Sequence, residues 1–556
     1  MSYSTACVDW ERRIVARESL IALPPLYPEL AADAWDVCGS FRLVDVTGQP
    51  LVRDASLPWL RDFVKTVFGA EDPDGRRHIN TFFLMVSKKN AKSTVAAAIM
   101  LGALIMNWRP SAELLILSPT KEIADNSYKP ISTMIKADPE LEAMLKVQDY
   151  HRTVTHIETG ATLKVVAADS DTVSGKKASF VFVDELHEFG KRAKASNMLL
   201  EATGGLASRP EGFVIYATTQ SEEPPAGVFK TKLEYARKVR DGVIEDRKFL
   251  PVIYEFPRAM LESKAYEQLN NAYVTNPNWG ASVDIERITQ LHSEAKASGE
   301  KEFKEFLAKH LNVEIGLNLR SDRWAGADFW EQQGVLEVTF SLNDLIARSE
   351  VVTMGGDGGG LDDLLGQYAV GRCKTTRRWL GWAHAWAHPS VLERRKEIAP
   401  RLQDFAKEGH LTLVERIGED VDQFAANVAM VYKAGLLYKM GIDPSGIGGI
   451  LDAMLQAGIP EDRIIGISQG WKLNGPIKTA ERKLAEGVFV HSAQPLMAWC
   501  VGNAKIVPSG NAIIITKQAS GTGKIDPLMA MFNAIELMSL NPEPMTQKVK
   551  KGFVSL

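Results

Sequence analysis

The chain has 556 residues, of which 45% are hydrophobic and 24% charged, and its formal net charge is -4 at pH 7. This length exceeds what one ordinary core holds, so at least two domains are expected. The negative charge excludes a chain that coats nucleic acid by bulk positive charge, and no apolar run is long enough to cross a bilayer, so we expect a soluble protein with no membrane partner.

The cysteines and the first residues indicate a reducing compartment. Cys7, Cys38, Cys373 and Cys500 are scattered, without the close pairs typical of zinc sites or disulfide frameworks. The start, MSYSTACVDWERR, lacks the basic-then-apolar order of a secretory signal. A cytoplasmic location is therefore expected.

Residues 76–256 alternate short apolar runs with helical patterns. The runs are TFFLMVS, AELLILSP, ATLKVVAAD, SFVFVDE, GFVIYATT and FLPVIYEF. Apolar runs bounded by polar turns predict strands buried on both faces of a largely parallel sheet. This segment is predicted to be an α/β domain. Residues 1–75, which include the helix-like LPWLRDFVKTVFG, are predicted to form an N-terminal arm on its edge.

The rest of the chain predicts a helical linker, a second α/β domain and a tail. Residues 257–345 carry charged helical patterns, with apolar residues on one helical stripe. Residues 346–540 resume the alternation of apolar runs and helices, and residues 541–556 form an exposed basic tail. The residues of the stripe are Phe303, Phe306, Leu307 and Leu311.

The junction between the first apolar run and an alanine-rich helix has the layout of a phosphate-binding loop. In the frame G-x-x-x-x-G-K-[ST], Val86 and Ala91 stand where glycines are usual, followed by Lys92 and Ser93. Such a loop offers backbone N–H groups at a helix N-terminus, a lysine for the terminal phosphates and a hydroxyl for the metal. Ala91 suits the loop if its φ is negative, because glycine is needed only at positive φ or where a Cβ would touch the ligand. By itself this stretch also fits a lysine-rich turn.

We predict nucleotide contacts along the whole loop. Of the two lysines before Lys92, one is expected to contact phosphate in place of an arginine of the same chain and the other to be solvated. The predicted nucleotide-binding residues of the loop are Lys88, Lys89, Asn90, Ala91, Lys92, Ser93 and Thr94.

A strand that ends in two acids makes the nucleotide interpretation more specific. The run SFVFVDE ends in Asp184 and Glu185. We predict that Asp184 holds Mg²⁺ together with Ser93, and that Glu185 orients and deprotonates the attacking water. Thr218 and Thr219, at the end of the next strand, are candidates for sensing the γ-phosphate, although a structural role fits them equally well.

Three aspartates at the ends of predicted elements indicate a carboxylate cluster in the second domain. Asp357 ends a strand in MGGDGGGLDDLLG, Asp443 ends another in KMGIDPSG, and Asp526 opens a helix in GKIDPLMAMFNAI. Two divalent ions held by shared carboxylates stabilise the attacking and leaving oxygens of phosphodiester cleavage, and oxygen ligands suit Mg²⁺ or Mn²⁺. Asp before Pro or Gly is also ordinary turn chemistry. The three together favour a nuclease.

Other groups around this cluster have two open interpretations. Asp362 or Asp363 could supply a further metal ligand, and the glycines around Asp357 could let a phosphate backbone come close. Lys524 either contacts the scissile phosphate or is exposed.

The histidines and tryptophans of the chain are assigned structural roles. His384 and His388 are four residues apart, but no acid or cysteine stands near them. Trp382 and Trp386 are expected to pack rather than to stack on bases. His187, just past the strand acids, is likewise predicted to be structural.

In combination, KKNAKS, VFVDELHE, YATT, GGDGGGLDDLLG, GIDPSG and KIDPLMAMFNAI resemble the large terminase subunit of tailed bacteriophages. The similarity spans about Leu57 to Leu540, and SDTVSGKKASFVFVDELHEF is its most specific part. The resemblance implies an N-terminal P-loop ATPase domain of the ASCE type with a mostly parallel sheet, a helical linker and a C-terminal RNase H-like nuclease domain.

The same resemblance implies the roles of individual residues. Thr218 and Thr219 correspond to the coupling motif, and Asp363 joins the metal ligands of the nuclease. The ATPase residues are Lys92, Ser93, Asp184 and Glu185, and the nuclease triad is Asp357, Asp443 and Asp526.

The resemblance further implies a DNA-packaging motor in the host cytoplasm. Its cofactors are ATP with Mg²⁺ and two nuclease ions, Mg²⁺ or Mn²⁺. Its partners are double-stranded DNA, the portal protein of the procapsid, the small terminase subunit and further copies in a ring, where Arg192 or Arg209 could complete a neighbouring site. Two alternatives stay open: a DNA-remodelling ATPase whose second domain binds without cutting, and an inactive nucleotide-binding scaffold.

Overall fold

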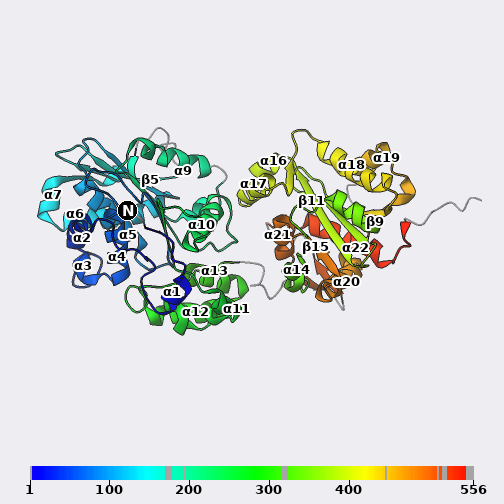
Figure 1. Ribbon diagram of the computed structural model, residues 1–556, viewed down its shortest axis with the longest axis horizontal. Coiled ribbons are helices and arrows are strands. Elements are labelled where there is room, and N and C mark those ends of the chain that lie inside the picture. Colours follow the sequence, from blue (N-terminus) through cyan, green and yellow to red (C-terminus); the bar gives the residue numbers. More distant parts are fainter. Residues whose placement is uncertain are drawn as a thin grey trace, which may run out of the picture. The chain divides into compact units, whose positions relative to one another are not determined.

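The computed structural model describes residues 3–168, 178–192, 195–315, 324–444, 448–509, 512–515 and 523–545. The chain divides into two compact units, Met1–Ile315 and Gly316–Leu556 (Figure 1), and each has its own hydrophobic core. The division falls inside residues 257–345, so that helical region is shared between the units. The bounds of the five segments drawn from the sequence stay a prediction.

The first unit is built on an eight-stranded sheet in the order β3-β4-β5-β2-β6-β7-β1-β8. Its parallel strands are the apolar runs that the sequence predicts as strands. The hairpin of β3 (Leu145–Gln148) and β4 (Thr153–His156) adds an antiparallel edge that the pattern does not indicate. The parallel strands are β1 (Thr81–Met85), β2 (Glu113–Ser118), β5 (Thr162–Ala167), β6 (Ala178–Val183), β7 (Phe213–Thr218) and β8 (Phe249–Ile253).

Helices cover this sheet because both of its faces are apolar. Helix α5 (Lys92–Met106) is apolar on nearly all sides and is buried from Val95 to Leu104, as expected of an interior helix. Phe229 and Leu233 of α10 (Gly227–Arg240) pack in the hydrophobic core that includes buried side chains of the strands. The other helices are α6 (Lys121–Lys136), α7 (Pro139–Met144), α8 (Leu186–Phe189) and α9 (Ala195–Thr203), with 3₁₀ turns η1 (Asp149–His151) and η3 (Gly204–Ser208).

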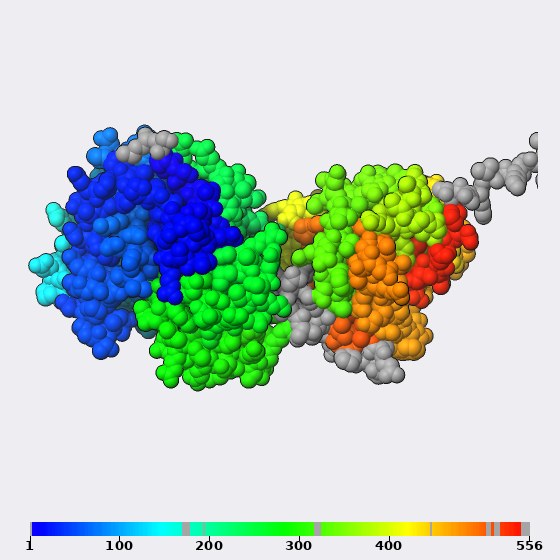
Figure 2. Space-filling view, turned by 60° about the horizontal axis from the view of Figure 1, so that its bottom comes forward, coloured from blue at the N-terminus to red at the C-terminus, as the bar shows by residue number. Residues whose placement is uncertain are grey.

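The N-terminal arm packs on the same unit. Cys7 N–H donates to the carbonyl of Arg240 at 2.9 Å, and the Tyr273 hydroxyl donates to the carbonyl of Val15 at 3.3 Å. Figure 2 shows these N-terminal residues, in blue, lying on the green helical residues. The arm contains α1 (Trp10–Val15), α2 (Pro28–Ser40), α3 (Val52–Ala55) and α4 (Pro58–Phe68).

The helices after β8 complete the first unit. In α13 (Glu300–Leu311) the predicted stripe is buried at Phe306, Leu307 and Leu311, and Phe303 is half-buried. The preceding elements are α11 (Arg258–Glu262), η4 (Ala265–Glu267), η5 (Leu269–Val274) and α12 (Ile285–Ser298).

The second unit contains a mixed sheet in the order β12-β11-β10-β9-β13-β14, with β15 paired to β11. Strands β9, β10 and β11 are antiparallel, whereas β13 is parallel to β9. Helix α22 (Asp526–Ser539) packs across β9, β10 and β13. The strands are β9 (Ser349–Gly358), β10 (Leu365–Cys373), β11 (Trp379–Ala387), β12 (Leu411–Leu413), β13 (Leu437–Ile442), β14 (Ile464–Gly466) and β15 (Phe489–His491), with a separate hairpin of β16 (Ile506–Ser509) and β17 (Ala512–Ile515).

The remaining helices of this unit surround the sheet. They are α14 (Ala327–Gln333), α15 (Leu342–Arg348), α16 (Ser390–Arg394), α17 (Ala399–Lys407), α18 (Glu419–Lys433), α19 (Gly448–Gln456), α20 (Asn474–Ala485) and α21 (Pro495–Asn503), with 3₁₀ turns η7 (Glu461–Arg463) and η8 (Gly470–Leu473). Among the described helices of the chain, none has the length and apolar character needed to span a membrane.

Candidate functional site

The lysine loop joins β1 to the N-terminus of α5 and contains two left-handed residues. Lys89 has a φ of 72° and Ala91 a φ of 60°. The condition that Ala91 has a negative φ is therefore not met. Because a left-handed conformation costs an L-residue about 1–2 kcal/mol, the surroundings of the loop must hold it in place.

Asn90 is the residue that holds the loop. Its side chain is fully buried, and its Nδ2 donates to the carbonyl of Ser87 at 3.0 Å and to Asn276 Oδ1 at 2.8 Å. Its Oδ1 accepts from the backbone N–H of Asn278 at 2.9 Å. In addition, the Ser282 hydroxyl donates a hydrogen bond to the carbonyl of Lys89 at 2.8 Å. The helical residues after β8 thus fix a loop that lacks glycine.

Parallel strands bring the lysine and the acids to one edge of the sheet, since β1, β6 and β7 all end there. Lys92 Nζ lies 3.6 Å from Glu185 Oε1 and 3.5 Å from the carbonyl of Val86. The Ser127 hydroxyl of α6 donates to Asp184 Oδ2 at 2.7 Å. Asp184 Oδ1 is buried and has no hydrogen-bond partner among the residues that the structure describes.

A cavity of about 740 Å³ opens between the loop and the acids. One wall is apolar and comes from the N-terminal arm, at Leu43, Val46 and Leu57. Asn90, by contrast, is fully buried and is absent from the lining. The predicted site residues that line the cavity are Lys88, Lys89, Ala91, Lys92, Ser93, Thr94, Asp184 and Glu185.

The charged groups of this site shift one another's pKa values. Burial and the neighbouring Glu185 raise the pKa of Asp184. Burial also acts to raise the pKa of Glu185, but Lys92, His187 and Lys88 outweigh it, so that pKa is lowered. Burial lowers the pKa of the Lys88 ammonium. Of the two acids, Glu185 is therefore the one whose ionised form the site favours more, which suits a water-activating base.

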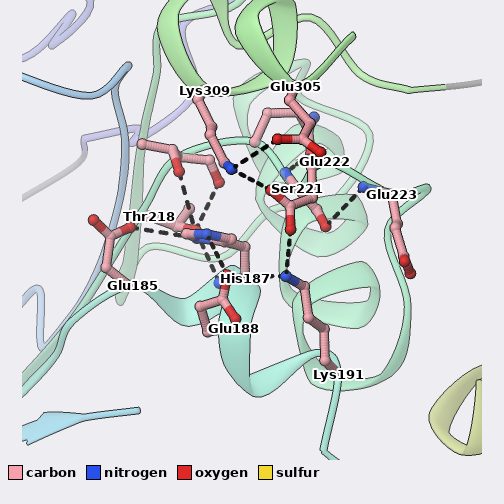
Figure 3. Close-up of polar contacts among 12 residues, drawn as sticks. Glu185, His187, Glu188, Lys191, Thr218, Ser221, Glu222, Glu223, Glu305 and Lys309 are labelled. Carbon is pink, nitrogen blue, oxygen red and sulfur yellow. Dashed lines mark hydrogen bonds and ion pairs between the residues drawn. The ribbon is translucent and has the colours of Figure 1, made fainter. Parts of the chain in front are cut away.

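Thr218 and Thr219 are fully buried behind the acids and do not line the cavity. Thr218 Oγ1 accepts the backbone N–H of His187 at 3.0 Å, and the His187 ring reaches both threonines and Glu185 (Figure 3). The His187 ring thus links the two threonines to Glu185.

The three predicted nuclease aspartates have adjoining backbones at one end of β9. Asp357 pairs with Gly366 of β10, and Gly356 pairs with Ile442, the residue before Asp443. A Cβ on Gly366 would lie 2.6 Å from the carbonyl carbon of Asp526.

The side chains of two of these aspartates are buried. Asp526 is fully buried and Asp357 is 7% exposed. Within the described residues, no group of three or more His, Cys, Asp or Glu side chains is assembled closely enough to hold a metal ion. The donor chemistry, carboxylate oxygen throughout, fits Mg²⁺ or Mn²⁺.

The glycines before Asp357 make room for other elements of the unit. A Cβ on Gly355 would overlap the backbone of Ala530 in α22, and one on Gly356 would overlap the Phe424 ring. Asn533 of α22 also donates to the carbonyl of Gly356 at 2.9 Å. The expectation that these glycines admit a phosphate backbone is therefore wrong for Gly355 and Gly356.

Lys524 is buried, which excludes the prediction that it is an exposed lysine. Its Nζ lies 2.7 Å from Asp363 Oδ1 and donates to the carbonyl of Asp362 at 2.9 Å. The Asp362 carboxylate instead pairs with Arg395 at 3.1 Å. Lys524 therefore holds the Asp363 carboxylate in place.

The groups expected to be structural have ordinary partners. His384 Nε2 lies 2.9 Å from the Thr412 hydroxyl, and His388 Nδ1 lies 2.8 Å from the Ser390 hydroxyl. The indole N–H of Trp386 donates to Gln423 Oε1 at 2.8 Å.

Models of two domain families match the chain in consecutive segments. The terminase large subunit ATPase domain matches residues 58–237, and the terminase large subunit endonuclease domain matches residues 258–540. The chain belongs to the terminase large subunit family. It therefore carries an ATPase domain and an endonuclease domain, as predicted, and the interpretation of the second domain as a module that only binds nucleic acid is not favoured.

Individual relatives of the chain are distant in sequence. The large terminase subunit of Enterobacteria phage HK97 is 21% identical over 88% of this chain and 91% of its own length. Protein YmfN of Escherichia coli K12 is 23% identical over 65% of this chain and 77% of its own length. The crystal structure of the HK97 large terminase is 19% identical, covers 91% of this chain and 99% of that chain, and has a TM-score of 0.46.

Some residues around the terminase ATPase site are not indicated by the sequence pattern. Ser127 lies in the middle of a helix, and Asn276 and Asn278 are far along the chain from the loop that they hold. The candidate arginines take local bonds: Arg192 Nη2 donates to the carbonyl of Pro119 at 2.6 Å, and Arg209 Nη1 to that of Ser208 at 3.3 Å. The motif segment 169–177 lies outside the described residues.

Proposed function

We propose that the first site hydrolyses ATP with Glu185 as the base that activates water. The observation that supports this most directly is the placement of Lys92 3.6 Å from Glu185 at the edge of one cavity of about 740 Å³. Loop N–H groups and the N-terminus of α5 bind the phosphates, since both present positive charge there. Lys92 reaches the terminal phosphate, and Lys88 and Lys89 add positive charge beside it.

Ser93 and Asp184 would hold Mg²⁺, and the buried Asp184 Oδ1 is a ligand atom without a hydrogen-bond partner among the described residues. The ion, when bound, neutralises charge on the transferred phosphoryl group. Asn90 keeps the loop in shape, Thr94 extends the phosphate contacts along α5, and Thr218 with Thr219 responds to the γ-phosphate from behind the acids. The apolar wall at Leu43, Val46 and Leu57 suits a nucleotide base.

For the second unit, we propose a nuclease in which Asp357, Asp443 and Asp526 hold two Mg²⁺ or Mn²⁺ ions, with Asp363 as a further ligand. Two such ions stabilise the attacking and leaving oxygens of phosphodiester cleavage. Lys524 Nζ, 2.7 Å from Asp363 Oδ1, keeps this carboxylate in place for that role.

At the level of the assembly, we propose a motor that drives double-stranded DNA into a procapsid and cuts concatemeric DNA. The family match to terminase ATPase and endonuclease domains supports this proposal. The portal protein, the small terminase subunit and further copies of this chain in a ring are the proposed partners. The host cytoplasm is the proposed location.

One substitution in each unit of the full chain tests the two sites. Glu185→Gln should reduce ATP turnover by about 100-fold or more, because it removes a general base, whereas Glu201→Gln, an exposed acid of α9, should leave it unchanged. Asp357→Ala should abolish plasmid cleavage with Mg²⁺ or Mn²⁺, and Asp452→Ala, an exposed acid of α19, should not. Turnover that survives Glu185→Gln, or cleavage that survives Asp357→Ala, would overturn the corresponding assignment.

A further inference from the structure

His187 lies between Glu185, the proposed catalytic base, and the ion pair of Glu188 with Lys191. The ATPase mechanism proposed above gives this histidine no role. It is buried, with 4% of its surface exposed. Its Nδ1 lies 3.3 Å from Glu185 Oε2, and its Nε2 lies 3.2 Å from Glu188 Oε1 (Figure 3). Each ring nitrogen therefore lies within ion-pair distance of a carboxylate oxygen.

Glu185 needs such support because its own backbone is strained. It ends the acid strand in a left-handed conformation with φ of 50°, which a residue with a Cβ keeps only when its surroundings impose it. Lys92 faces one of its carboxylate oxygens at 3.6 Å and His187 faces the other. With the imidazole removed, one side of the carboxylate would lose its restraint.

The same histidine is attached to the end of β7. Its backbone N–H donates to Thr218 Oγ1 at 3.0 Å. Its Nδ1 lies 3.3 Å from Thr218 Oγ1 and 3.4 Å from Thr219 Oγ1. A displacement of Thr218 or Thr219 would therefore move the His187 ring, whose Nδ1 lies 3.3 Å from Glu185 Oε2.

From the ring, ion pairs continue to α13. Glu188 Oε1 lies 2.9 Å from Lys191 Nζ, which lies 3.3 Å from Glu222 Oε1. The other carboxylate oxygen of Glu222 pairs with Lys309 of α13. The backbone carbonyl of Lys309 accepts the N–H of Lys88 at 2.8 Å. The contacts thus lead from Glu185 through α13 back to the lysine loop, and Figure 3 shows them as far as Lys309.

We propose that His187 is a positioning residue for ATP hydrolysis: its ring fixes the Glu185 carboxylate against Thr218 and Thr219. Through Glu188 it also joins that carboxylate to the ion pairs that end on Lys309. The proposal rests on the proposed role of Glu185. It differs from a purely structural role, in which the ring fills space beside Phe229, 6.3 Å away between ring centroids.

Three variants of the full chain separate these roles. His187→Leu removes both ring nitrogens and keeps an apolar side chain beside Phe229. His187→Asn restores an amide near the place of Nδ1, where it can donate to Glu185. His156→Leu is the matched control, because His156 is also buried in this unit but lies on β4, in the antiparallel hairpin at the edge of the sheet. For each variant, kcat and KM for ATP, binding of a fluorescent ATP analogue and thermal unfolding are measured.

We expect His187→Leu to lower kcat by roughly 10- to 100-fold, because a small displacement of a reacting group has that effect on rate. KM and analogue binding should stay as in the unaltered chain. His187→Asn should recover part of kcat, and His156→Leu should leave it unchanged.

The possible failures are distinct. If His187→Leu turns over ATP normally while Glu185→Gln does not, the positioning role is wrong and the proposed function stands. If Leu and Asn lower kcat, nucleotide affinity and unfolding temperature equally, His187 is structural and the proposal is overturned. If Glu185→Gln retains full turnover, or the unaltered chain hydrolyses no ATP, the proposed function itself fails, and with it the inference.

Discussion

Asp184 occupies a buried position where a carboxylate needs compensating donors. The Ser127 hydroxyl supplies one at 2.7 Å, and this hydrogen bond acts to lower a pKa that burial and Glu185 raise. Removal of the hydroxyl in Ser127→Ala should raise that pKa further and weaken the proposed Mg²⁺ site. Because hydrogen bonds to charged groups contribute about 1.5–3 kcal/mol, the Mg²⁺ concentration for half-maximal ATP hydrolysis should rise by roughly 10- to 100-fold.

A matched variant checks that the loss of a helical serine is not itself the cause. Ser132→Ala removes another buried hydroxyl of α6, which donates to Asp149 at 2.9 Å, away from the site. It should leave the Mg²⁺ dependence unchanged. Equal dependence in Ser127→Ala and the unaltered chain would contradict a role of Asp184 in metal binding.

Ala91 is a second residue with a measurable local cost. At φ of 60°, Ala91→Gly relieves about 1–2 kcal/mol of strain but adds about 0.5–1 kcal/mol of chain entropy in the unfolded state. The free energy of unfolding should rise by up to about 1 kcal/mol. Ala97→Gly, inside α5, should instead lower it by about 1 kcal/mol or more. Denaturant unfolding measures the free energy of unfolding of both variants. A lower value for Ala91→Gly than for the unaltered chain would contradict the backbone strain assigned to Ala91.

At the scale of elements, Asn90 joins the lysine loop to the turn before α12. Asn90→Ala would remove the hydrogen bonds that Asn276 Oδ1, the backbone N–H of Asn278 and the carbonyl of Ser87 make with Asn90 in a buried region, which costs about 1–3 kcal/mol for each group left unsatisfied. We expect faster hydrogen exchange in residues 86–91 and 276–282 together, and weaker binding of an ATP analogue.

Asn107→Ala is the control for this exchange experiment, since Asn107 is buried at the other end of α5. It should leave exchange in both segments unchanged. Faster exchange in residues 86–91 alone, without a change in 276–282, would show that Asn90 does not couple the two segments.

The packing of α22 on β9 gives a prediction for the nuclease. Gly355→Ala would place a methyl group against the backbone of Ala530, so the helix must shift and carry Asp526 with it. Plasmid cleavage should fall by about 100-fold, as expected when reacting groups move by about 1 Å. Gly360→Ala, in the same glycine-rich stretch, meets nothing closer than 3.5 Å and should keep full cleavage. Equal cleavage by the two variants would contradict this account.

These elements also show what a sequence can and cannot predict. The parallel strands and their terminal acids were predictable, because apolar runs and strand-end motifs are local patterns. The support of the lysine loop was not, since Asn90 and Asn276 are 186 positions apart and Asn276 belongs to none of the motifs. The left-handed φ of Ala91 is the conformation that a glycine adopts readily, but the alanine at this position led us to expect a negative φ. The role of His187 depends on Thr218, 31 positions away, and thus on the order of the strands.

At the scale of the whole molecule, the two compact units have separate cores. We therefore expect thermal unfolding of the chain to show two transitions. A nucleotide that binds the folded first unit alone stabilises it by about 2.7 kcal/mol at a hundredfold excess over its Kd. A non-hydrolysable ATP analogue with Mg²⁺ should accordingly raise the temperature of one transition and leave the other unchanged.

Residues 1–315 made alone identify which transition belongs to the ATPase unit. This fragment should unfold at the temperature of the nucleotide-sensitive transition and should respond to the analogue by the same increase. Lys92→Ala in the full chain should abolish the response, because the ammonium at the edge of the cavity is the proposed phosphate contact. A single cooperative transition, or an analogue that shifts both transitions equally, would show that the units do not unfold independently and that nucleotide binding stabilises the chain as a whole.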